Sequence, residues 1–367
     1  MSIYQRVKEE LLTNKKLREE GKHIAIPWPN LPKLSTVLPG IQRGRYIIVS
    51  ANSKVGKTQL CDYLFLYEPL EFIYKNPNSD IKLKIFYFSL EMGKEDKVLQ
   101  MVSNKIYRDN GRSISTDDLR SYFAGYTLTD ELAGIIATYE SYFNWVESHV
   151  EFIDNVRNPY GIYKAVREFA RLNGKFYDKE DREVHIDNGD TFYDHYVPND
   201  PDLRVVVITD HLSLLQPEKG QELWDAMFNF SSNYCLKIRD NFNYTVVNVQ
   251  QQAADQEKQQ FTFKGDSIVE KLRPSADGLA DCKLTGRDCD LLLTLFSPNR
   301  YKIATYPVKN GYDITKLGDN YREFSIALNR RGGGSINLDL YFDGKCNYFS
   351  ELPPVGSEML QNLYNSL

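Results

Sequence analysis

Tyr46-Ile47-Ile48-Val49-Ser50-Ala51-Asn52-Ser53-Lys54-Val55-Gly56-Lys57-Thr58 is the stretch that decides the fold. Its first five residues form an apolar, β-branched run that is typical of a buried strand. A turn of small residues follows, and residues 59–65 then have the pattern of a helix. A strand, a loop and a helix in this order direct backbone N–H groups and the positive end of the helix dipole at one anion. We therefore predict a phosphate-binding loop.

The residue types in this loop specify a nucleotide and a metal ion. Lys57 is expected to reach the β- and γ-phosphates, and the Thr58 hydroxyl is expected to ligate Mg²⁺. The motif normally starts with glycine, and Ala51 stands there in this chain, which is tolerated where φ is negative. A chance Gly-Lys-Thr in a helix-capping turn is the alternative. The predicted cofactors are ATP and Mg²⁺, and the predicted binding residues are Ala51, Asn52, Ser53, Lys54, Val55, Gly56, Lys57 and Thr58.

The composition is that of an ordinary globular protein. The chain has 367 residues, of which 42% are hydrophobic and 26% are charged, with a net charge of −5. No apolar run approaches the roughly 20 residues of a membrane span, and the N-terminus lacks a signal-peptide pattern. Five scattered cysteines indicate neither a zinc site nor a disulfide framework. We expect a cytoplasmic protein with no membrane contact. Its mild acidity argues against indiscriminate coating of nucleic acid but is compatible with a local basic channel.

Two further apolar runs end in a carboxylate. Residues 84–89 read as a strand that leads to Glu91, and residues 203–209 read as a strand that leads to Asp210. Functional groups of α/β proteins gather at the carboxyl ends of buried strands. Glu91 is therefore predicted to orient and polarise the attacking water, and Asp210 to hold the Mg²⁺ site. The alternatives are a helix N-terminal charge for Glu91 and a helix cap or turn for Asp210.

The remaining segments have less specific patterns. Residues 3–21 form a charged helix with one narrow apolar stripe, which lies either on its own domain or on a neighbouring subunit. The acidic, turn-rich residues 174–202 read as an inserted loop or hairpin. A strand over 244–249 ends in Gln250-Gln251-Gln252, whose amides can sense a γ-phosphate. The next segment, 253–273, is poor in apolar residues. Its cations are Lys258, Lys264, Lys271 and Arg273.

Taken in order, these motifs resemble the RecA-type motor domain of DnaB-type (superfamily 4) replicative helicases. The resemblance covers residues 33–350. It rests on the lead-in LPGIQRGRYIIVSA, the phosphate loop, Phe88-Ser89-Leu90-Glu91-Met92, the Asp210 strand, the strand to Gln251, Arg273-Pro274 before an Asp-containing stretch, and Leu328-Asn329-Arg330-Arg331-Gly332. It implies an α/β fold with a RecA-like P-loop core, a mostly parallel twisted sheet flanked by helices, and a C-terminal β-hairpin. Residues 107–148 and 174–202 are expected to be insertions, 1–32 a helix and linker, and 351–367 a tail.

The resemblance also implies functional roles. Glu91 matches the catalytic glutamate, Asp210 the metal-site aspartate and Gln251 the sensor glutamine. Arg330 matches the arginine finger that acts on the γ-phosphate of the neighbouring subunit, which implies a homo-oligomer, with a hexameric ring as the family pattern. Single-stranded DNA is the expected partner, with a primase or a helicase loader as further partners. The predicted DNA-binding residues are Lys271, Arg273, Asp281 and Lys283.

The chain departs from the family pattern at several points. Leu328 stands where the family has a lysine two residues before the finger, and His211 follows the metal-site aspartate, where we expect it to be a packing or polar neighbour. No counterpart of the helical N-terminal collar domain or of a primase module is recognised, and the composition is compatible with a phage-like gene. Two other functions share the same catalytic residues: a RecA-like recombinase or mediator that forms filaments on DNA, and a nucleotide-gated assembly module without unwinding activity.

Overall fold

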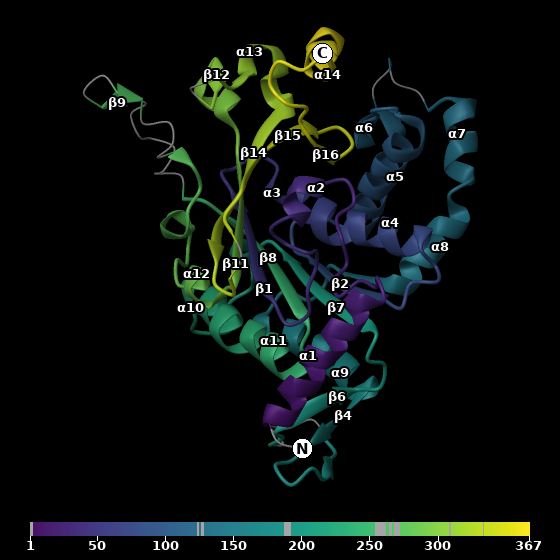
Figure 1. Ribbon diagram of the computed structural model, residues 1–367, viewed down its shortest axis with the longest axis vertical. Helices are drawn as coiled ribbons and strands as arrows, with labels where there is room; N and C mark the ends of the chain where they lie inside the picture. Colours follow the sequence, from purple (N-terminus) through teal and green to yellow (C-terminus); the bar gives the residue numbers. More distant parts are fainter. Residues whose placement is uncertain are drawn as a thin grey trace.

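A computed structural model describes residues 3–122, 125, 128–186, 192–253, 262–263, 266–267, 272–307, 310–332 and 334–367. Its centre is one nine-stranded sheet with the strand order β16-β15-β14-β11-β1-β8-β7-β2-β3 (Figure 1). The strands are β1 (Tyr46–Ala51), β2 (Lys82–Ser89), β3 (Val150–Ile153), β7 (Leu203–Asp210), β8 (Thr245–Gln251), β11 (Leu291–Phe296), β14 (Tyr321–Asn329), β15 (Asn337–Asp343) and β16 (Tyr348–Glu351).

The strands from β11 through β3 run parallel, and β14, β15 and β16 add an antiparallel edge. Every residue of β1 and of β11 is buried. This burial on both faces explains their continuous apolar runs, which are typical of parallel strands covered by helices on each side. The predicted α/β fold with a mostly parallel sheet and a C-terminal hairpin is confirmed.

Two long helical runs cover opposite faces of the sheet. The first is α3 (Lys57–Asp62), continued through a π-helical turn into α4 (Glu68–Lys75). It shares a core with β1, β11 and the C-terminal strands. The second run joins α10 (Leu223–Asn229) and α11 (Leu236–Phe242), again through a π-helical turn, and packs with α9 (Pro159–Leu172) on the other face.

The two segments in which insertions are expected, 107–148 and 174–202, contain elements outside the nine-stranded sheet. Residues 94–149 form α5 (Lys94–Asn110), α6 (Thr116–Leu119), α7 (Asp130–Ala137) and α8 (Glu140–His149), which share a small core of their own. The acidic segment 174–202 contains a three-stranded sheet of β4 (Gly174–Tyr177), β5 (Glu183–Val184) and β6 (His195–Pro198).

The ends of the chain differ in how they pack. α1 (Ile3–Glu19) is largely exposed, whereas the proline-rich segment after it is packed on the domain: Trp28 is buried and donates its indole N–H to the Leu64 carbonyl at 2.8 Å. The segment expected to be a tail contains α14 (Glu358–Ser366), whose Leu360 is buried in a third core beside α13 (Ile314–Leu317). α1 and α14 lie at opposite ends of the molecule (Figure 1).

The remaining elements are short. They are α2 (Pro32–Ser35), α12 (Thr285–Asp288), β9 (Thr262–Phe263), β10 (Asp266–Ser267), β12 (Thr305–Tyr306) and β13 (Tyr312–Asp313). Among the described helices, none has the length and apolar character needed to cross a bilayer.

Candidate functional site

The parallel strands bring the predicted functional groups to one edge of the sheet. Ala51 at the end of β1 is paired with Gln251 at the end of β8, and Ser89 at the end of β2 is paired with Asp210 at the end of β7. Carboxyl ends of parallel strands always meet at the same edge, which is where α/β folds bind ligands. Residues that are far apart in the sequence thus become neighbours.

A cavity of about 490 Å³ opens at this edge. Four residues with different predicted roles line it: Lys57, Thr58, Glu91 and Gln251. Ser53, Lys54 and Gly56 of the loop also line it. The structure therefore brings the predicted phosphate loop, the predicted water-orienting carboxylate and the predicted sensor around one volume.

The loop has the conformation that a phosphate-binding turn needs. Gly56 has a φ of 108°, in the region that glycine adopts readily, and it is directly followed by the first residue of α3. The first N–H groups of a helix have no partner within the helix, so the start of α3 offers donors to an anion. Lys57 adds a full positive charge at the same place.

Asp210 lies beneath the loop and is completely buried. The Thr58 hydroxyl donates to Asp210 Oδ1 at 2.9 Å, and Asp210 Oδ2 is 3.3 Å from both the Lys97 ammonium and the Tyr87 hydroxyl. Burial alone would lower the pKa of Lys97, but the attraction of Asp62 and Asp210 outweighs it and raises this pKa above its ordinary value. Lys97 therefore stays charged beside the two carboxylates.

The donor set at this position fits Mg²⁺. A hydroxyl and a carboxylate oxygen, Thr58 Oγ1 and Asp210 Oδ1, lie together at the floor of the phosphate loop. Mg²⁺ is usually held by one or two protein oxygens, with substrate phosphates and waters completing its octahedron. Among the described residues, no cluster of three or more His, Cys, Asp or Glu side chains could hold a metal ion.

Glu91 and His211 both line the cavity. The Glu91 side chain is 52% exposed, and its Oε2 lies 4.0 Å from His211 Nε2. Burial, and then the charge of Lys57, lower the pKa of His211, so the neutral imidazole is favoured. A neutral ring fits the predicted role of a polar neighbour.

Of the three consecutive glutamines, one lines the cavity and the other two bind the segment 275–280. Gln251 lines the cavity, whereas Gln250 Nε2 donates to the Ala280 carbonyl at 2.7 Å and Gln252 Nε2 to the Ser275 carbonyl at 3.1 Å. The Gln251 carbonyl accepts from the Ala280 N–H at 2.8 Å. Residues 275–280 are therefore held directly by the strand end that faces the nucleotide site.

The predicted DNA-binding residues have different surroundings. Asp281 and Lys283 are exposed, and Asp281 accepts a hydrogen bond from the Ser213 hydroxyl at 2.6 Å. The Arg273 guanidinium donates two hydrogen bonds to the buried Glu323 carboxylate, from Nε to Oε2 at 2.7 Å and from Nη2 to Oε1 at 2.6 Å. Its charge is thus compensated within the domain, and its geometry does not support the predicted DNA contact. Lys271 lies outside the described residues, as do Lys258 and Lys264.

Arg330 lies far from the cavity of its own subunit. It follows β14, whose last residue, Asn329, pairs with Leu291 at the start of β11. The phosphate loop is at the other end of the parallel strands, and the six residues of β11 span about 20 Å at roughly 3.3 Å per residue. Arg330 is exposed, with one guanidinium nitrogen 3.3 Å from the Gly286 carbonyl, and it cannot reach the loop cavity of the same chain.

Several residues that support the loop were not predicted from the sequence. Arg322 is buried and donates from Nε to the Val55 carbonyl at 2.7 Å, and Arg300 donates to the Ser53 carbonyl. The Asn52 amide donates to the Tyr301 hydroxyl at 2.9 Å. These partners lie far along the chain from the loop, and no local pattern identifies them.

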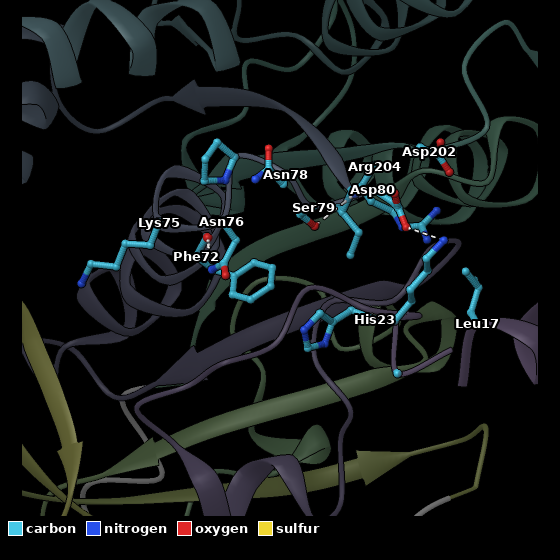
Figure 2. A pocket seen from close by; sticks show the side chains of 14 residues that line it. Leu17, His23, Phe72, Lys75, Asn76, Asn78, Ser79, Asp80, Asp202 and Arg204 are labelled. Carbon is cyan, nitrogen blue, oxygen red and sulfur yellow. Dashed lines mark hydrogen bonds and ion pairs between the residues drawn. The ribbon is translucent and has the colours of Figure 1, made fainter. Parts of the chain in front are cut away.

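A second cavity of similar size, about 480 Å³, lies at the opposite end of the strands (Figure 2). It is formed by the end of α1, the end of α4, the segment 76–81 that precedes β2, and the start of β7. Two of its cations have acidic partners: Lys22 is 3.0 Å from Asp80, and Lys75 is 2.7 Å from Glu71. Arg204 also lines this cavity, and its Nε is buried without a hydrogen-bond partner among the described residues. Size alone does not separate the two cavities, but only the loop cavity combines helix N–H donors, a lysine and a buried carboxylate.

The chain is similar to two solved structures over nearly its whole length. One is described as the ATPase domain of G40P, with a TM-score of 0.64, 18% sequence identity, and coverage of 95% of this chain and 99% of that one. The other is a DnaB-like replicative helicase, described with its interactions with primase, with a TM-score of 0.64, 18% identity, and coverage of 94% of this chain and 68% of that one. No protein-family model and no curated protein matches the sequence. The predicted RecA-like fold of DnaB-type helicases is thereby confirmed.

Replacing Lys57 distinguishes the two cavities. We expect Lys57→Ala to weaken binding of Mg·ATP by about 10- to 100-fold, because a hydrogen bond to a charged group contributes roughly 1.5–3 kcal/mol. Lys75→Ala, in the second cavity, is the matched control and should leave the affinity unchanged. Titration calorimetry on both variants measures this. Equal losses in the two variants, or a loss with Lys75→Ala alone, would contradict the assignment of the site.

Proposed function

We propose that the protein is an ATP-driven DNA helicase motor that assembles into a ring, translocates on single-stranded DNA and separates the duplex ahead of it. The observation that carries the proposal is the convergence of Lys57, Thr58, Glu91 and Gln251 on one cavity above Asp210. This arrangement occurs in a fold that is shared, end to end, with the ATPase domain of G40P.

Each residue has a role in hydrolysis that follows from its position. Lys57 and the first N–H groups of α3 bind the β- and γ-phosphates, and Thr58 with Asp210 holds Mg²⁺, which neutralises phosphate charge when it is bound. Glu91, which lines the cavity and is exposed, orients the attacking water and polarises it as a general base. Gln251 contacts the γ-phosphate side and carries its state to residues 275–280 through the bonds of its own backbone and of its two neighbours.

The neighbouring subunit completes the site. Arg330 lies at the end of the strands that is remote from its own loop, so its guanidinium is available to the triphosphate of the next subunit in a head-to-tail ring. Such a finger in trans stabilises charge that develops on the transferred phosphoryl group. The family pattern has a lysine at the position that Leu328 occupies in this chain. Because leucine carries no charge, the proposed contact depends on Arg330 alone.

The N-terminal helix offers a surface for the same assembly. Tyr4, Val7, Leu11 and Leu12 of α1 are each between 46% and 74% exposed. Their spacing places them along one side of the helix. A solvated helix gains little from such a stripe, whereas burial against an adjacent subunit removes it from water. We propose that α1 docks on a neighbouring motor domain.

DNA is proposed to run past the segment that follows β8 and the start of α12. Lys283 is exposed there, and its ammonium can bind a phosphate without regard to base sequence. The N–H groups of Ala280 and Cys282 already donate to the Gln251 and Ala280 carbonyls, so they hold the segment in place. Lys271 belongs to the same proposal. A primase or a helicase loader is proposed as a further partner, because the similar DnaB-like helicase is described with its interactions with primase.

Strand displacement tests the function directly. We expect the wild-type protein to hydrolyse ATP faster with single-stranded DNA and to separate a forked duplex, and Glu91→Gln to bind Mg·ATP normally while losing both activities. The loss should be about 10²- to 10⁴-fold, the usual contribution of a general base. Glu95→Gln, an exposed neighbour at the start of α5, is the control and should remain active.

Other results would redirect the proposal. Hydrolysis that is stimulated by DNA but never separates strands would indicate a filament-forming recombinase or mediator. Hydrolysis that ignores DNA would indicate a nucleotide-gated assembly module. Normal turnover by Glu91→Gln would show that another group activates the water.

Mixing two inactive variants tests the finger. Lys57→Ala lacks the loop lysine and Arg330→Ala lacks the finger, so each is expected to be inactive alone. In a mixed head-to-tail ring, about a quarter of the interfaces join an intact loop to an intact finger, so that fraction of the ATPase activity should return. Arg331→Ala, whose guanidinium is paired with Asp290 at 3.0 Å, should be active without mixing. Absence of any recovery on mixing would make Arg330 an ordinary hairpin residue.

A further inference from the structure

A buried lysine joins the elements that carry the candidate catalytic groups. Lys97, in the first turn of α5, has no exposed surface. Its ammonium lies 2.9 Å from Asp62 Oδ2 and 3.3 Å from Asp210 Oδ2. The Tyr87 hydroxyl donates to Asp62 Oδ1 at 2.6 Å and lies 3.3 Å from Asp210 Oδ2. This network of four side chains is formed by α3, β2, α5 and β7.

The two carboxylate oxygens of Asp210 contact different groups. Oδ1 accepts the hydrogen bond of Thr58, at the floor of the phosphate loop, and Oδ2 faces Lys97 and Tyr87. A carboxylate held at both oxygens cannot rotate about its terminal torsion without breaking one of these contacts. Oδ1 therefore stays directed at the site where Thr58 offers its own oxygen.

Lys97 lies in the first turn of the helix that follows Glu91. Its N–H donates to the carbonyl of Gly93, the N-terminal cap of α5, at 3.2 Å. Only Met92 separates Gly93 from Glu91. The bond to Gly93 belongs to the backbone and would be kept with another side chain at position 97, so the ammonium itself acts on the two aspartates.

We propose that Lys97 is a positioning residue for the magnesium site, which acts by holding Asp210 Oδ2 so that Oδ1 and Thr58 Oγ1 present their oxygens together. The proposal rests on the proposed function, since it requires that Thr58 and Asp210 bind Mg²⁺ with a nucleotide. Asp62 has a different part: it compensates the charge of Lys97 and draws the ammonium toward α3. Groups that orient a metal ligand without touching the metal typically change metal affinity by about 10- to 100-fold.

The same helix provides a lysine for comparison. Lys105 is also buried on α5, and its ammonium is paired with Glu71 at 3.3 Å and Asp109 at 3.1 Å. It lies eight residues from Lys97, about 12 Å along the helix at 1.5 Å per residue. Both lysines stabilise the packing of α5 through buried ion pairs, but only Lys97 contacts Asp210. Replacing Lys105 therefore measures how much the loss of a buried ion pair on α5 lowers stability, without any change at Asp210.

The experiment separates stability from positioning with three variants. Lys97→Met removes the charge and leaves Asp62 and Asp210 facing each other, so its melting temperature should fall. Asp62→Asn/Lys97→Met removes one carboxylate as well, which leaves the network with the same net charge as wild type, and its melting temperature should rise above that of the single variant. Lys105→Met should have a lower melting temperature than wild type, with no change in the Mg²⁺ concentration that nucleotide binding requires.

Magnesium dependence is then measured with N-methylanthraniloyl-ATP, whose fluorescence reports binding without turnover, while MgCl₂ is titrated into the full chain. The folded double variant should need about 10- to 100-fold more Mg²⁺ than wild type for half-maximal binding, and Lys105→Met should match wild type. Wild-type Mg²⁺ dependence in the folded double variant, or an equal shift in Lys105→Met, would overturn the positioning role alone. A wild-type protein that binds the nucleotide without any Mg²⁺ dependence would overturn the proposed site together with this role.

Discussion

The hydrogen bond between Thr58 and Asp210 is the interaction on which the rest of the site depends. It joins the first turn of α3 to the end of β7, two elements that are 152 residues apart in the sequence. The bond requires β1 and β7 to end at the same edge, which the parallel order β1-β8-β7-β2 provides. Once these two residues are in place, Glu91 and Gln251 follow from the register of the neighbouring strands. The candidate chemistry is therefore a consequence of sheet topology.

Local patterns predicted the parts of this site that are local. The apolar runs of β1, β2, β7 and β8 and the turn before α3 are each visible in a short stretch of residues, because strand burial and glycine conformation are properties of short segments. The order of these segments then identified the fold. That residues 107–148 and 174–202 are insertions stays a prediction, and the structure shows a small three-stranded sheet within the second of these segments.

What the sequence did not reveal depends on contacts between distant residues. Arg322 and Arg300 bind carbonyl groups of the phosphate loop, and Lys97 lies between two aspartates, yet each reads locally as an ordinary charged residue of a strand, a turn or a helix. Arg273 is an example in which a local pattern misled the prediction. As a cation in a polar segment it was predicted to bind DNA, whereas in the structure it forms an ion pair with the buried Glu323. Helix α14 was not predicted, because its few apolar residues do not form a clear local pattern and are buried only by packing against the core around α13.

Separation of the loop and the finger by the length of the sheet has a consequence for assembly. Lys57 lies at one edge of the sheet and Arg330 at the other. In the proposed head-to-tail assembly, each subunit carries two incomplete half-sites, and a second copy completes one of them. Turnover per subunit should then be a property of the assembly.

The most direct measurement is ATP hydrolysis per subunit across a range of protein concentrations, with the native mass determined at each point. The account predicts that specific activity rises in step with the fraction of subunits in the oligomer and is negligible for the monomer. Full activity in a species of monomer mass would contradict it.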